Sequence, residues 1–376
     1  MMDDPLGVAA LNDWVGKELP PYPQPMLGMS QVDSPDPVDV SDIRRSAYSV
    51  ADYNPLYDDP AYAKTTRHGG VVAPPYFFYA IESGGGHPPV PPPENTTVVY
   101  AGTDWEYFTP LRVGDVVHTK RKFLRAEEKQ SKFSGRAAYF YGETTYLNQR
   151  DEILATAVAI HARFHIEDAK SQGKYKGEDA MPTFDEAMLR KIQHDKQHQE
   201  IRGAEPRYFD DVEVGDVLTP IVQGPLWMGE CVFYFQGARR WKTGESTMAY
   251  PRDPAEIPLH PMPDPWTAGH TNNEPGQAFE NRAMPRGFDV GYQRVAWLQR
   301  LASSWVGDDG DIKSLKGRLT RPNFEGDVSW YTGKVVGKRV ERGEHLVDCE
   351  LTAHNQDDLA HTFGSFTAAL PTKSGK

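Results

Sequence analysis

The chain has 376 residues, more than one hydrophobic core usually serves, so we expect two domains. Its net charge of −12 disfavours nucleic-acid binding through a basic surface, because such binding depends on lysine and arginine. The sequence has no run of about 18 apolar residues and no basic-then-apolar start, so we expect a cytoplasmic protein without membrane contact.

The two cysteines predict neither a disulfide framework nor a metal site. Cys231 and Cys349 lie far apart in the sequence, and neither has histidines at ligand spacing. We therefore expect no metal and a reducing compartment.

Residues 1–39 are predicted to form an N-terminal arm, and residues 40–165 a first domain. The arm opens with a short helix that Asp4 can cap. The first domain is centred on the run from Asp52 to Tyr57 (Asp-Tyr-Asn-Pro-Leu-Tyr), whose Asn-Pro step favours a turn. Further along, Pro74 and Pro75 suit the first turn of a short helix.

Residues 166–204 are charged and polar and are predicted to be a linker. Thr183 and Glu186 have the spacing of a capping box, which predicts a helix starting there. Met188, Leu189 and Ile192 give this helix only a thin apolar stripe. We expect the helix to pack across both domains.

Residues 205–372 are predicted to form a second domain around a buried helix. Val295, Leu298, Ala302 and Trp305 recur at steps of three and four residues, which predicts a helix from about Gly291 to Trp305. From Val347 to Ala353 apolar residues alternate with polar ones, as in a half-buried strand. A buried helix needs such a sheet around it.

The two domains repeat each other in sequence. Gly114-Asp115 is followed 33 residues later by Asn148-Gln149, and Gly326-Asp327 is followed 28 residues later by Asn355-Gln356. Each pair follows a predicted buried helix and encloses a predicted hairpin. The shared order indicates a tandem duplication, although Gly-Asp and Asn-Gln are also common turn formers.

The Asp52–Tyr57 run, the order of elements and the paired turns resemble the MaoC-like acyl dehydratases, which include the R-specific enoyl-CoA hydratases. The resemblance covers about residues 40–165 and 205–370. It implies an α+β fold, a tandem double hot-dog in which each half wraps an antiparallel sheet around a buried helix. It also implies a hydro-lyase acting on an acyl-CoA substrate, with no separate cofactor, and a homo-oligomer such as a dimer of double hot-dog subunits.

In this family the active loop reads Asp-x-Asn-Pro-x-His, and its aspartate and histidine activate a water molecule. The first half matches the motif at Asp52 and Asn54, but Tyr57 stands at the histidine position. Tyrosine titrates near ~10, so it cannot replace imidazole as a base near neutral pH without a large shift. We therefore interpret the first half as a substrate-tunnel and scaffold domain.

In the second half, His270 precedes the buried helix where the family has its catalytic histidine, and Asp264 lies six residues earlier. The family spacing is five residues, and no Asn-Pro step separates this pair. The backbone N–H of Gly291, at the helix start, is the candidate donor to the thioester oxygen. The glycine could equally serve close packing of the helix on the sheet.

Two basic clusters are candidates for binding the phosphates of coenzyme A. Lys120, Arg121 and Lys122 form one of them, and Arg239 and Arg240 the other. Such clusters often only solvate a strand or a helix end.

Three interpretations remain open from the sequence. The first is hydration or dehydration of an acyl-CoA, with His270 and Asp264 as the catalytic pair. A variant of it places the chemistry in the first half, at Asp52 with Asn54 or Tyr57. The others are an acyl-CoA-binding protein without turnover and a thioesterase of the same fold.

Overall fold

The computed structural model describes residues 4–20, 36–82, 88–238 and 283–374. Within these residues, nine antiparallel strands form one twisted sheet in the order β2-β3-β4-β1-β6-β9-β8-β7-β5. The first half contributes β1 (Thr96–Tyr107), β2 (His118–Ser131), β3 (Gly135–Leu147) and β4 (Ile153–His165). The second half contributes β5 (Val217–Gln223), β6 (Asp311–Leu319), β7 (Ser329–Glu341), β8 (Glu344–Asn355) and β9 (Ala360–Ala369).

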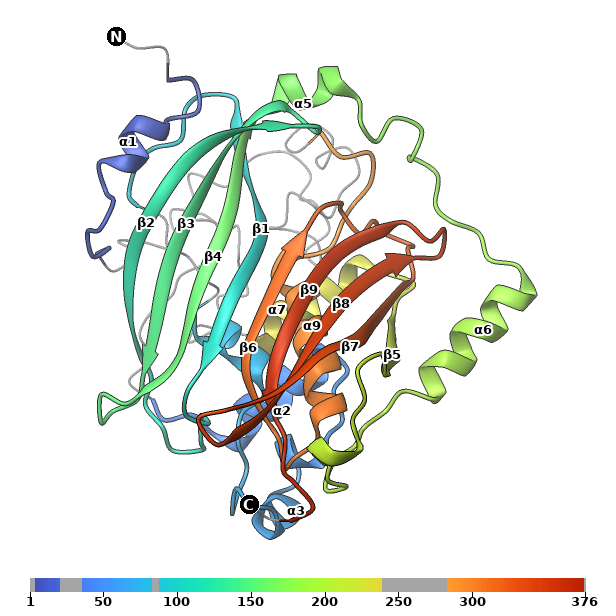
Figure 1. Ribbon diagram of the computed structural model, residues 1–376. Helices are drawn as coiled ribbons and strands as arrows, with labels where there is room; N and C mark the ends of the chain where they lie inside the picture. Colours follow the sequence, from blue (N-terminus) through green and yellow to red (C-terminus); the bar gives the residue numbers. More distant parts are fainter. Residues whose placement is uncertain (1–3, 21–35, 83–87, 239–282, 375–376) are drawn as a thin grey trace, which may run out of the picture.

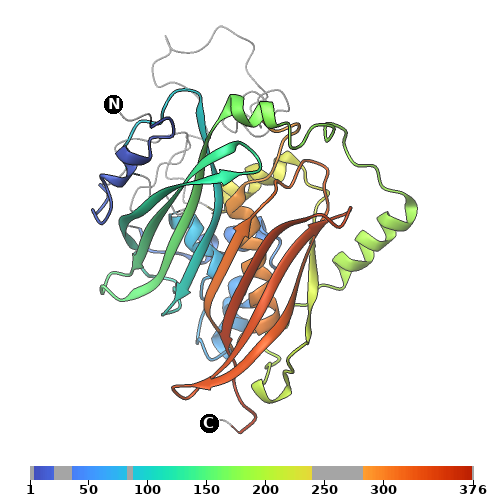
Figure 2. The same cartoon turned by 45° about the horizontal axis from the view of Figure 1, so that its top comes forward.

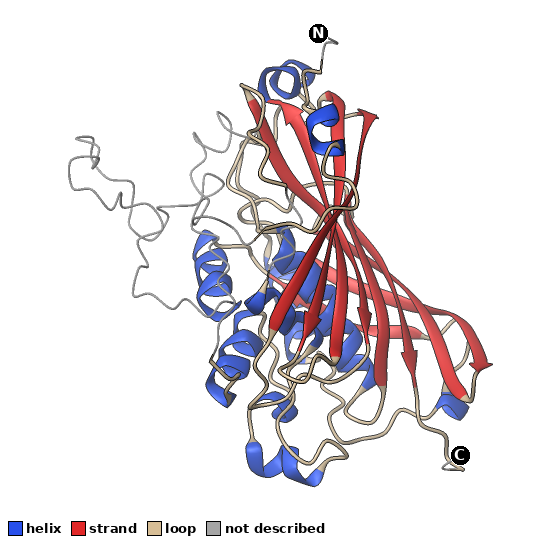
Figure 3. Ribbon diagram, turned by 90° about the vertical axis from the view of Figure 1, so that its left-hand side faces the viewer, coloured by secondary structure: helices blue, strands red, loops and turns tan. Residues whose placement is uncertain are grey.

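Most of the helices lie on one face of this sheet (Figure 3). The helices are α1 (Val8–Asn12), α2 (Val40–Ser49), α3 (Pro60–Thr65), α4 (Phe78–Ile81), α5 (Ile166–Gln172), α6 (Glu186–Gln197), α7 (Met228–Ala238) and α9 (Gly291–Val306). Short 3₁₀ turns are η2 (Pro55–Tyr57), η3 (Pro75–Phe77) and η4 (Phe209–Asp211). The described helices all fall short of the length and apolarity that a membrane span requires.

The two halves join along strands β1 and β6, which lie side by side at the centre of the sheet (Figures 1 and 2). The joint runs from the pair Gly102–Arg318 to the pair Glu106–Ser314. At Gly102 the backbone has a φ of 147°, and an added Cβ would collide with the carbonyl oxygen of Gly317. Glycine at this position therefore permits the close approach of the two half-sheets.

Helix α9 is the core of the second half, as predicted. The four apolar residues of the predicted stripe are at most 3% exposed. The prediction of one buried face was too narrow, however, because every residue from Tyr292 to Val306 is buried. The polar side of the helix is covered by the first half: Gln299 donates to the Tyr107 hydroxyl, and Arg300 donates to the carbonyl of Val50.

The first half has a much shorter element in the place of α9. Among the described residues, the helical elements between Pro74 and β1 are η3 and α4, which together run from Pro75 to Ile81. Their side chains from Tyr76 to Ala80 are all buried. The two halves thus share a plan, but only the second has a long central helix.

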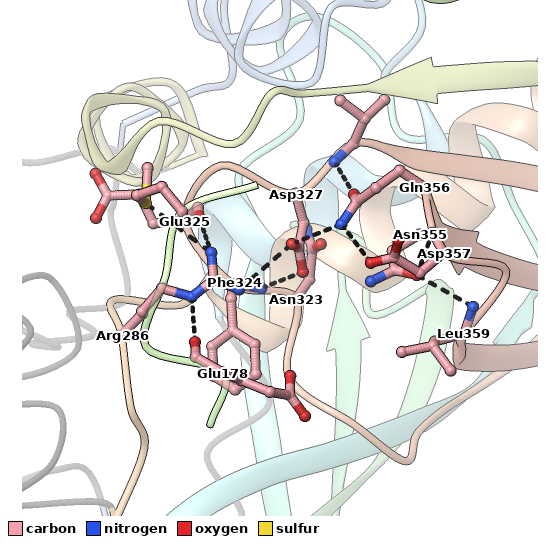
Figure 4. Close-up of polar contacts among 12 residues, drawn as sticks. Glu178, Arg286, Asn323, Phe324, Glu325, Asp327, Asn355, Gln356, Asp357 and Leu359 are labelled. Atoms are coloured by element: carbon pink, nitrogen blue, oxygen red, sulfur yellow. Dashed lines mark hydrogen bonds and ion pairs between the residues drawn. The ribbon is translucent and has the colours of Figure 1, made fainter. Parts of the chain in front are cut away.

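The predicted repeat is confirmed in its hydrogen bonds. In the second half, the Gln356 side chain accepts from the Val328 backbone N–H at 2.9 Å and donates to Asp327 at 3.2 Å (Figure 4). In the first half, Gln149 accepts from Val116 at 2.9 Å and donates to Asp115 at 3.4 Å. Asn148 and Asn355 likewise each accept two backbone N–H bonds within their own turn. Such detailed agreement supports duplication over coincidence.

The N-terminal arm covers the outer edge of the sheet. Leu19 donates to the Arg121 carbonyl and Gly16 to the Phe123 carbonyl, so the arm adds main-chain bonds to edge strand β2. The Asn12 side chain bonds both the N–H and the carbonyl of Ala126, at 2.8 Å and 3.1 Å. The arm therefore satisfies backbone groups that would otherwise be open to another chain.

Replacing Asn12 by alanine is expected to loosen this edge. The substitution removes two hydrogen bonds to a buried strand residue, at a cost of about 1–3 kcal/mol in local stability. Amide hydrogen exchange at Ala126 and its neighbours on β2 should then quicken. The matched control is Asp13→Ala, one residue along, and equal exchange in both variants would contradict the assigned role of Asn12.

The linker carries a helix, but its start and its packing differ from the prediction. The α6 cap is Asp185, whose carboxylate accepts from the Met188 N–H, so the predicted Thr183 capping box was wrong. Ile192 packs with Val222 and Trp330 of the second half. Leu189, predicted to belong to the apolar stripe, is half exposed.

Candidate functional site

The candidate residues fall in four places, one of which lies outside the described residues. His270, Asp264, Arg239 and Arg240 belong to the segment 239–282 and remain predictions from the sequence. Gly291 begins α9, and the run from Asp52 to Tyr57 follows α2. Lys120, Arg121 and Lys122 lie on β2.

Gly291 and Pro75 occupy equivalent positions in the two halves. An isolated bridge joins Phe288 to Phe324 in the second half, and another joins Val72 to Arg112 in the first. The central helical element starts three residues after the first partner of each bridge. Proline has no N–H, so the first half cannot offer a donor where the second half offers that of Gly291.

The surroundings of Gly291 also require a small residue. A Cβ at this position would lie 2.6 Å from the Tyr100 ring and 3.1 Å from Leu319. Close packing therefore accounts for the glycine without any function. The Gly291 N–H can nevertheless donate a hydrogen bond to a ligand, because the first N–H groups of a helix have no intrahelical acceptor and lie at its positive end.

Asp52 is enclosed by its own half. The carboxylate is 2% exposed and accepts from the Asn54 backbone N–H at 3.1 Å and from the Tyr76 hydroxyl at 2.9 Å. Burial raises the pKa of this carboxyl, and the nearby Arg300 guanidinium opposes that rise. Both carboxylate oxygens therefore already accept a hydrogen bond from the protein, and one of the donors is Tyr76, the residue after Pro75.

Tyr57 lies in the same buried cluster. Burial raises the pKa of its hydroxyl well above the ordinary value of 10.0, and the neighbouring Asp52 adds to that rise. A phenol with a raised pKa is a weaker candidate for a base at neutral pH than an unperturbed one. The first half therefore has neither the helix-start donor nor an accessible base at this motif.

Asn54 connects the two halves. Its side-chain oxygen accepts from the Leu56 N–H, and its side-chain nitrogen donates to Asp308, just beyond α9, at 2.9 Å. Asp308 also accepts from the Tyr62 hydroxyl at 2.6 Å. Asn54 therefore stabilises the contact between the two halves.

We expect Asn54→Ala and Asp308→Ala each to destabilise the protein by about 1–3 kcal/mol, since each leaves a buried polar group unpaired. Because the two side chains bond each other, the double variant should cost less than the sum of the single ones. Urea unfolding of the four proteins in this cycle measures that coupling. Asp309→Ala, from the same loop, is the control, and strictly additive costs would refute the junction role.

The basic residues of β2 do not gather near Gly291. Arg121 is buried, and its guanidinium donates to the Pro20 carbonyl of the arm at 2.7 Å. Lys120 and Lys122 alternate with it along the strand and so point to the opposite, exposed face of the sheet. Strand β2 is also three strand positions away from β1, against which Gly291 packs.

The structure reveals a second buried cluster, beside the start of α9, that the sequence did not suggest. Asp289 lies two residues before Gly291, is 1% exposed and pairs with Arg294 at 2.9 Å. Its backbone N–H donates to the Asn323 carbonyl at 3.0 Å. The chain of contacts continues from the Asn323 side chain to Ser329 at 3.0 Å and from Ser329 to His361 at 3.1 Å.

The protonation states within this cluster follow from its contacts and burial. Ser329 donates to Asn323, so its oxygen accepts from His361 Nε2–H. Burial lowers the pKa of His361 well below 6.5, which keeps this imidazole neutral. Burial raises the pKa of Asp289 to about 7, against the attraction of Arg294. A carboxyl that titrates near neutral pH beside a helix start is a functional candidate.

Asp289 should make stability depend on pH. The pKa of the Asp289 carboxyl is about 7 in the folded state, above the ordinary value of 3.8 that applies when the chain is unfolded. The folded state therefore holds the proton more tightly. Its contribution is therefore fully present below pH ~4 and is lost as pH rises through 7, with a slope of at most about 1.4 kcal/mol per pH unit. Urea unfolding across this range should show that slope in the wild type but not in Asp289→Asn. Parallel curves would contradict the assignment.

Asp289 could have been noticed in the sequence as a lone carboxylate between Phe288 and Val290, immediately before the buried helix. Its partners could not, because they come from a helix, a loop and two strands. Nothing in the spacing of Arg294, Ser329 and His361 indicates that they meet.

Comparison with known proteins gives the class to which this fold belongs. A family model described as the FAS1-like dehydratase domain region matches residues 26–157. A structure titled MaoC-like dehydratase has a TM-score of 0.63 at 17% identity, over 95% of this chain and 98% of the other. No curated protein matches the sequence.

Two further structures share the architecture. A putative MaoC domain protein dehydratase from Chloroflexus aurantiacus J-10-fl has a TM-score of 0.58 at 13% identity, over 96% of each chain. A Mycobacterium tuberculosis protein described as having a double hotdog fold has a TM-score of 0.55 at 11% identity, over 90% of this chain and 94% of the other. The chain therefore has the double hot-dog fold, as predicted. The family match adds a likeness to a dehydratase region, limited to residues 26–157 of the first half.

Proposed function

We propose that this protein adds water to, or removes it from, the α,β double bond of an acyl-CoA thioester, and that the second half carries the reaction. The observation that carries this proposal is the difference between the two helix starts. Gly291 offers an N–H at the start of a long buried helix, whereas Pro75 offers none. An enolate oxygen needs such a fixed donor, and a single donor can be worth about 10² to 10³ in rate.

In the hydration direction, His270 accepts a proton from water while the water oxygen forms a bond to the β-carbon. The electrons of the double bond move toward the carbonyl, and the thioester oxygen gains negative charge. The Gly291 N–H and the positive end of α9 stabilise that charge. Delivery of a proton to the α-carbon completes the product, and Asp264 is the proposed partner of His270 in these transfers. Dehydration follows the same steps in reverse.

The first half serves this reaction as a scaffold in our proposal. The enclosure of Asp52 by Asn54 and Tyr76 supports this division, as does its position beside Pro75. If Asp52 were the catalytic residue instead, its carboxylate would have to break its hydrogen bonds to Asn54 and Tyr76 before it could reach a substrate.

The proposal is tested by incubating the protein with a panel of α,β-unsaturated acyl-CoA esters and following loss of the conjugated thioester absorbance. The expected result is loss of absorbance without release of free CoA. Release of CoA, detected with a thiol reagent, would indicate a thioesterase instead. Binding of acyl-CoA with neither change would indicate a binding protein and would overturn the proposal.

A further inference from the structure

A line of buried polar atoms without partners runs along α9. Gln293 Oε1, Trp297 Nε1 and the Tyr331 hydroxyl have no hydrogen-bond partner among the described residues. Gln293 and Trp297 are each 1% exposed, and Tyr331 is fully buried. A buried polar group left unpaired costs about 1–3 kcal/mol, so three together call for an explanation.

These three side chains lie close to one another. Gln293 and Trp297 are four residues apart on α9 and therefore share one face of the helix. Tyr331 projects from β7 toward that face, with its ring centroid 5.6 Å from that of Trp297. The group begins half a turn beyond Gly291, and Trp297 lies about 9 Å further along the helix axis than Gly291.

The three atoms have complementary hydrogen-bonding roles. The Trp297 indole N–H can only donate, the Tyr331 hydroxyl can donate or accept, and the Gln293 amide oxygen accepts. The charged groups that act on Tyr331 are Asp289 and Arg294, and these pair with each other. A group that satisfied these atoms would thus be uncharged and would carry at least one acceptor oxygen.

We infer that the acyl group of the substrate lies along this face of α9 and carries an uncharged oxygen, such as a hydroxyl, keto or ether group. The Trp297 N–H and the Tyr331 hydroxyl hydrogen-bond that oxygen. The inference rests on the proposed function, because Gly291 fixes the thioester end from which the acyl chain extends. A site built to hydrogen-bond a ligand oxygen discriminates strongly against an analogue without it.

The test compares the binding of saturated acyl-CoA esters, which cannot undergo hydration. Isothermal titration calorimetry gives Kd for plain medium-chain esters and for esters of the same length with one keto or hydroxyl group at successive positions beyond the β-carbon, where the proposed reaction cannot act. The wild type is expected to bind the best oxygenated ester about 10- to 100-fold more tightly than its plain counterpart. Trp297→Phe and Tyr331→Phe should each lower that ratio toward one.

Trp305→Phe is the matched control, since it makes the same change eight residues further along α9, where Trp305 packs against Phe366. It should retain the wild-type ratio. A ratio near one in the wild type would overturn the inference, as would a ratio that survives in both Trp297→Phe and Tyr331→Phe. Because the ligands are saturated, these outcomes are independent of whether the protein turns over enoyl-CoA, so failure of the proposed function remains a separate result.

Discussion

Replacing His270 by alanine is expected to lower kcat on the best enoyl-CoA substrate by about 10²- to 10⁴-fold, the usual contribution of a positioned acid or base. The reason is chemical: hydration needs a group that accepts a proton near neutral pH, and an unperturbed imidazole titrates near ~6.5. In the first half the corresponding position holds Tyr57, whose pKa is raised by burial. Binding of acyl-CoA should persist, since the imidazole acts on water.

The matched control for this experiment is His260→Ala, which removes another imidazole ten residues earlier in the sequence. It should leave kcat within a few-fold of the wild type. Calorimetry with a saturated acyl-CoA separates a loss of chemistry from a loss of binding. Near-normal turnover by His270→Ala, or an equal loss in both variants, would show that His270 is not the base.

Replacing Arg294 by methionine is expected to destabilise the fold by about 3–5 kcal/mol, because it leaves the buried Asp289 carboxylate without its cation. Both side chains of this ion pair are at most 6% exposed. The penalty should shrink as pH falls toward 7, because without Arg294, which lowers the pKa of Asp289, the carboxyl takes up its proton at a higher pH than in the wild type. Urea unfolding at pH 5 and pH 8, about two pH units below and one unit above that pKa, measures both effects.

Arg318→Met is the control for this second experiment. Arg318 also pairs with an aspartate, Asp104, but that ion pair is more than one-third exposed on both sides. Its loss should cost less than about 1 kcal/mol. Equal costs for the two substitutions, or a cost for Arg294→Met that does not vary with pH, would contradict the account of the buried pair.

The repeat and the central helix could be predicted because both depend on local patterns. The Gly-Asp and Asn-Gln pairs can be recognised in the sequence, and in the structure Gln149 and Gln356 make equivalent contacts. Apolar spacing likewise identified α9. Its burial on all sides could not be predicted, because the residues that cover its polar side, such as Tyr107 and Val50, come from the other half.

The same reason explains the misplaced predictions elsewhere. Strand β4 is an example, because its residues from Ala159 to Phe164 are buried on both faces. Ala169 of the linker and Ala283 cover one of those faces, and no pattern within the strand indicates this. The α6 cap was misjudged because Asp185 and Thr183 are both good capping residues, and only the backbone geometry decides between them.

For the candidate site, the sequence identified residue types but not their surroundings. Asp52 and Asn54 match the family motif, yet their contacts are those of an enclosed carboxylate and an inter-half connection. The cluster around Asp289 was missed because its members are up to 72 residues apart in the sequence and meet only in the folded chain.

The most direct test of our central claim, that the second half performs the reaction, is a crystal structure with an unreactive acyl-CoA analogue bound. The account predicts the thioester oxygen about 2.7–3.1 Å from the Gly291 nitrogen. It also predicts the β-carbon closer to His270 than to Asp52. A thioester bound beside Pro75, with its β-carbon next to Asp52, would contradict it.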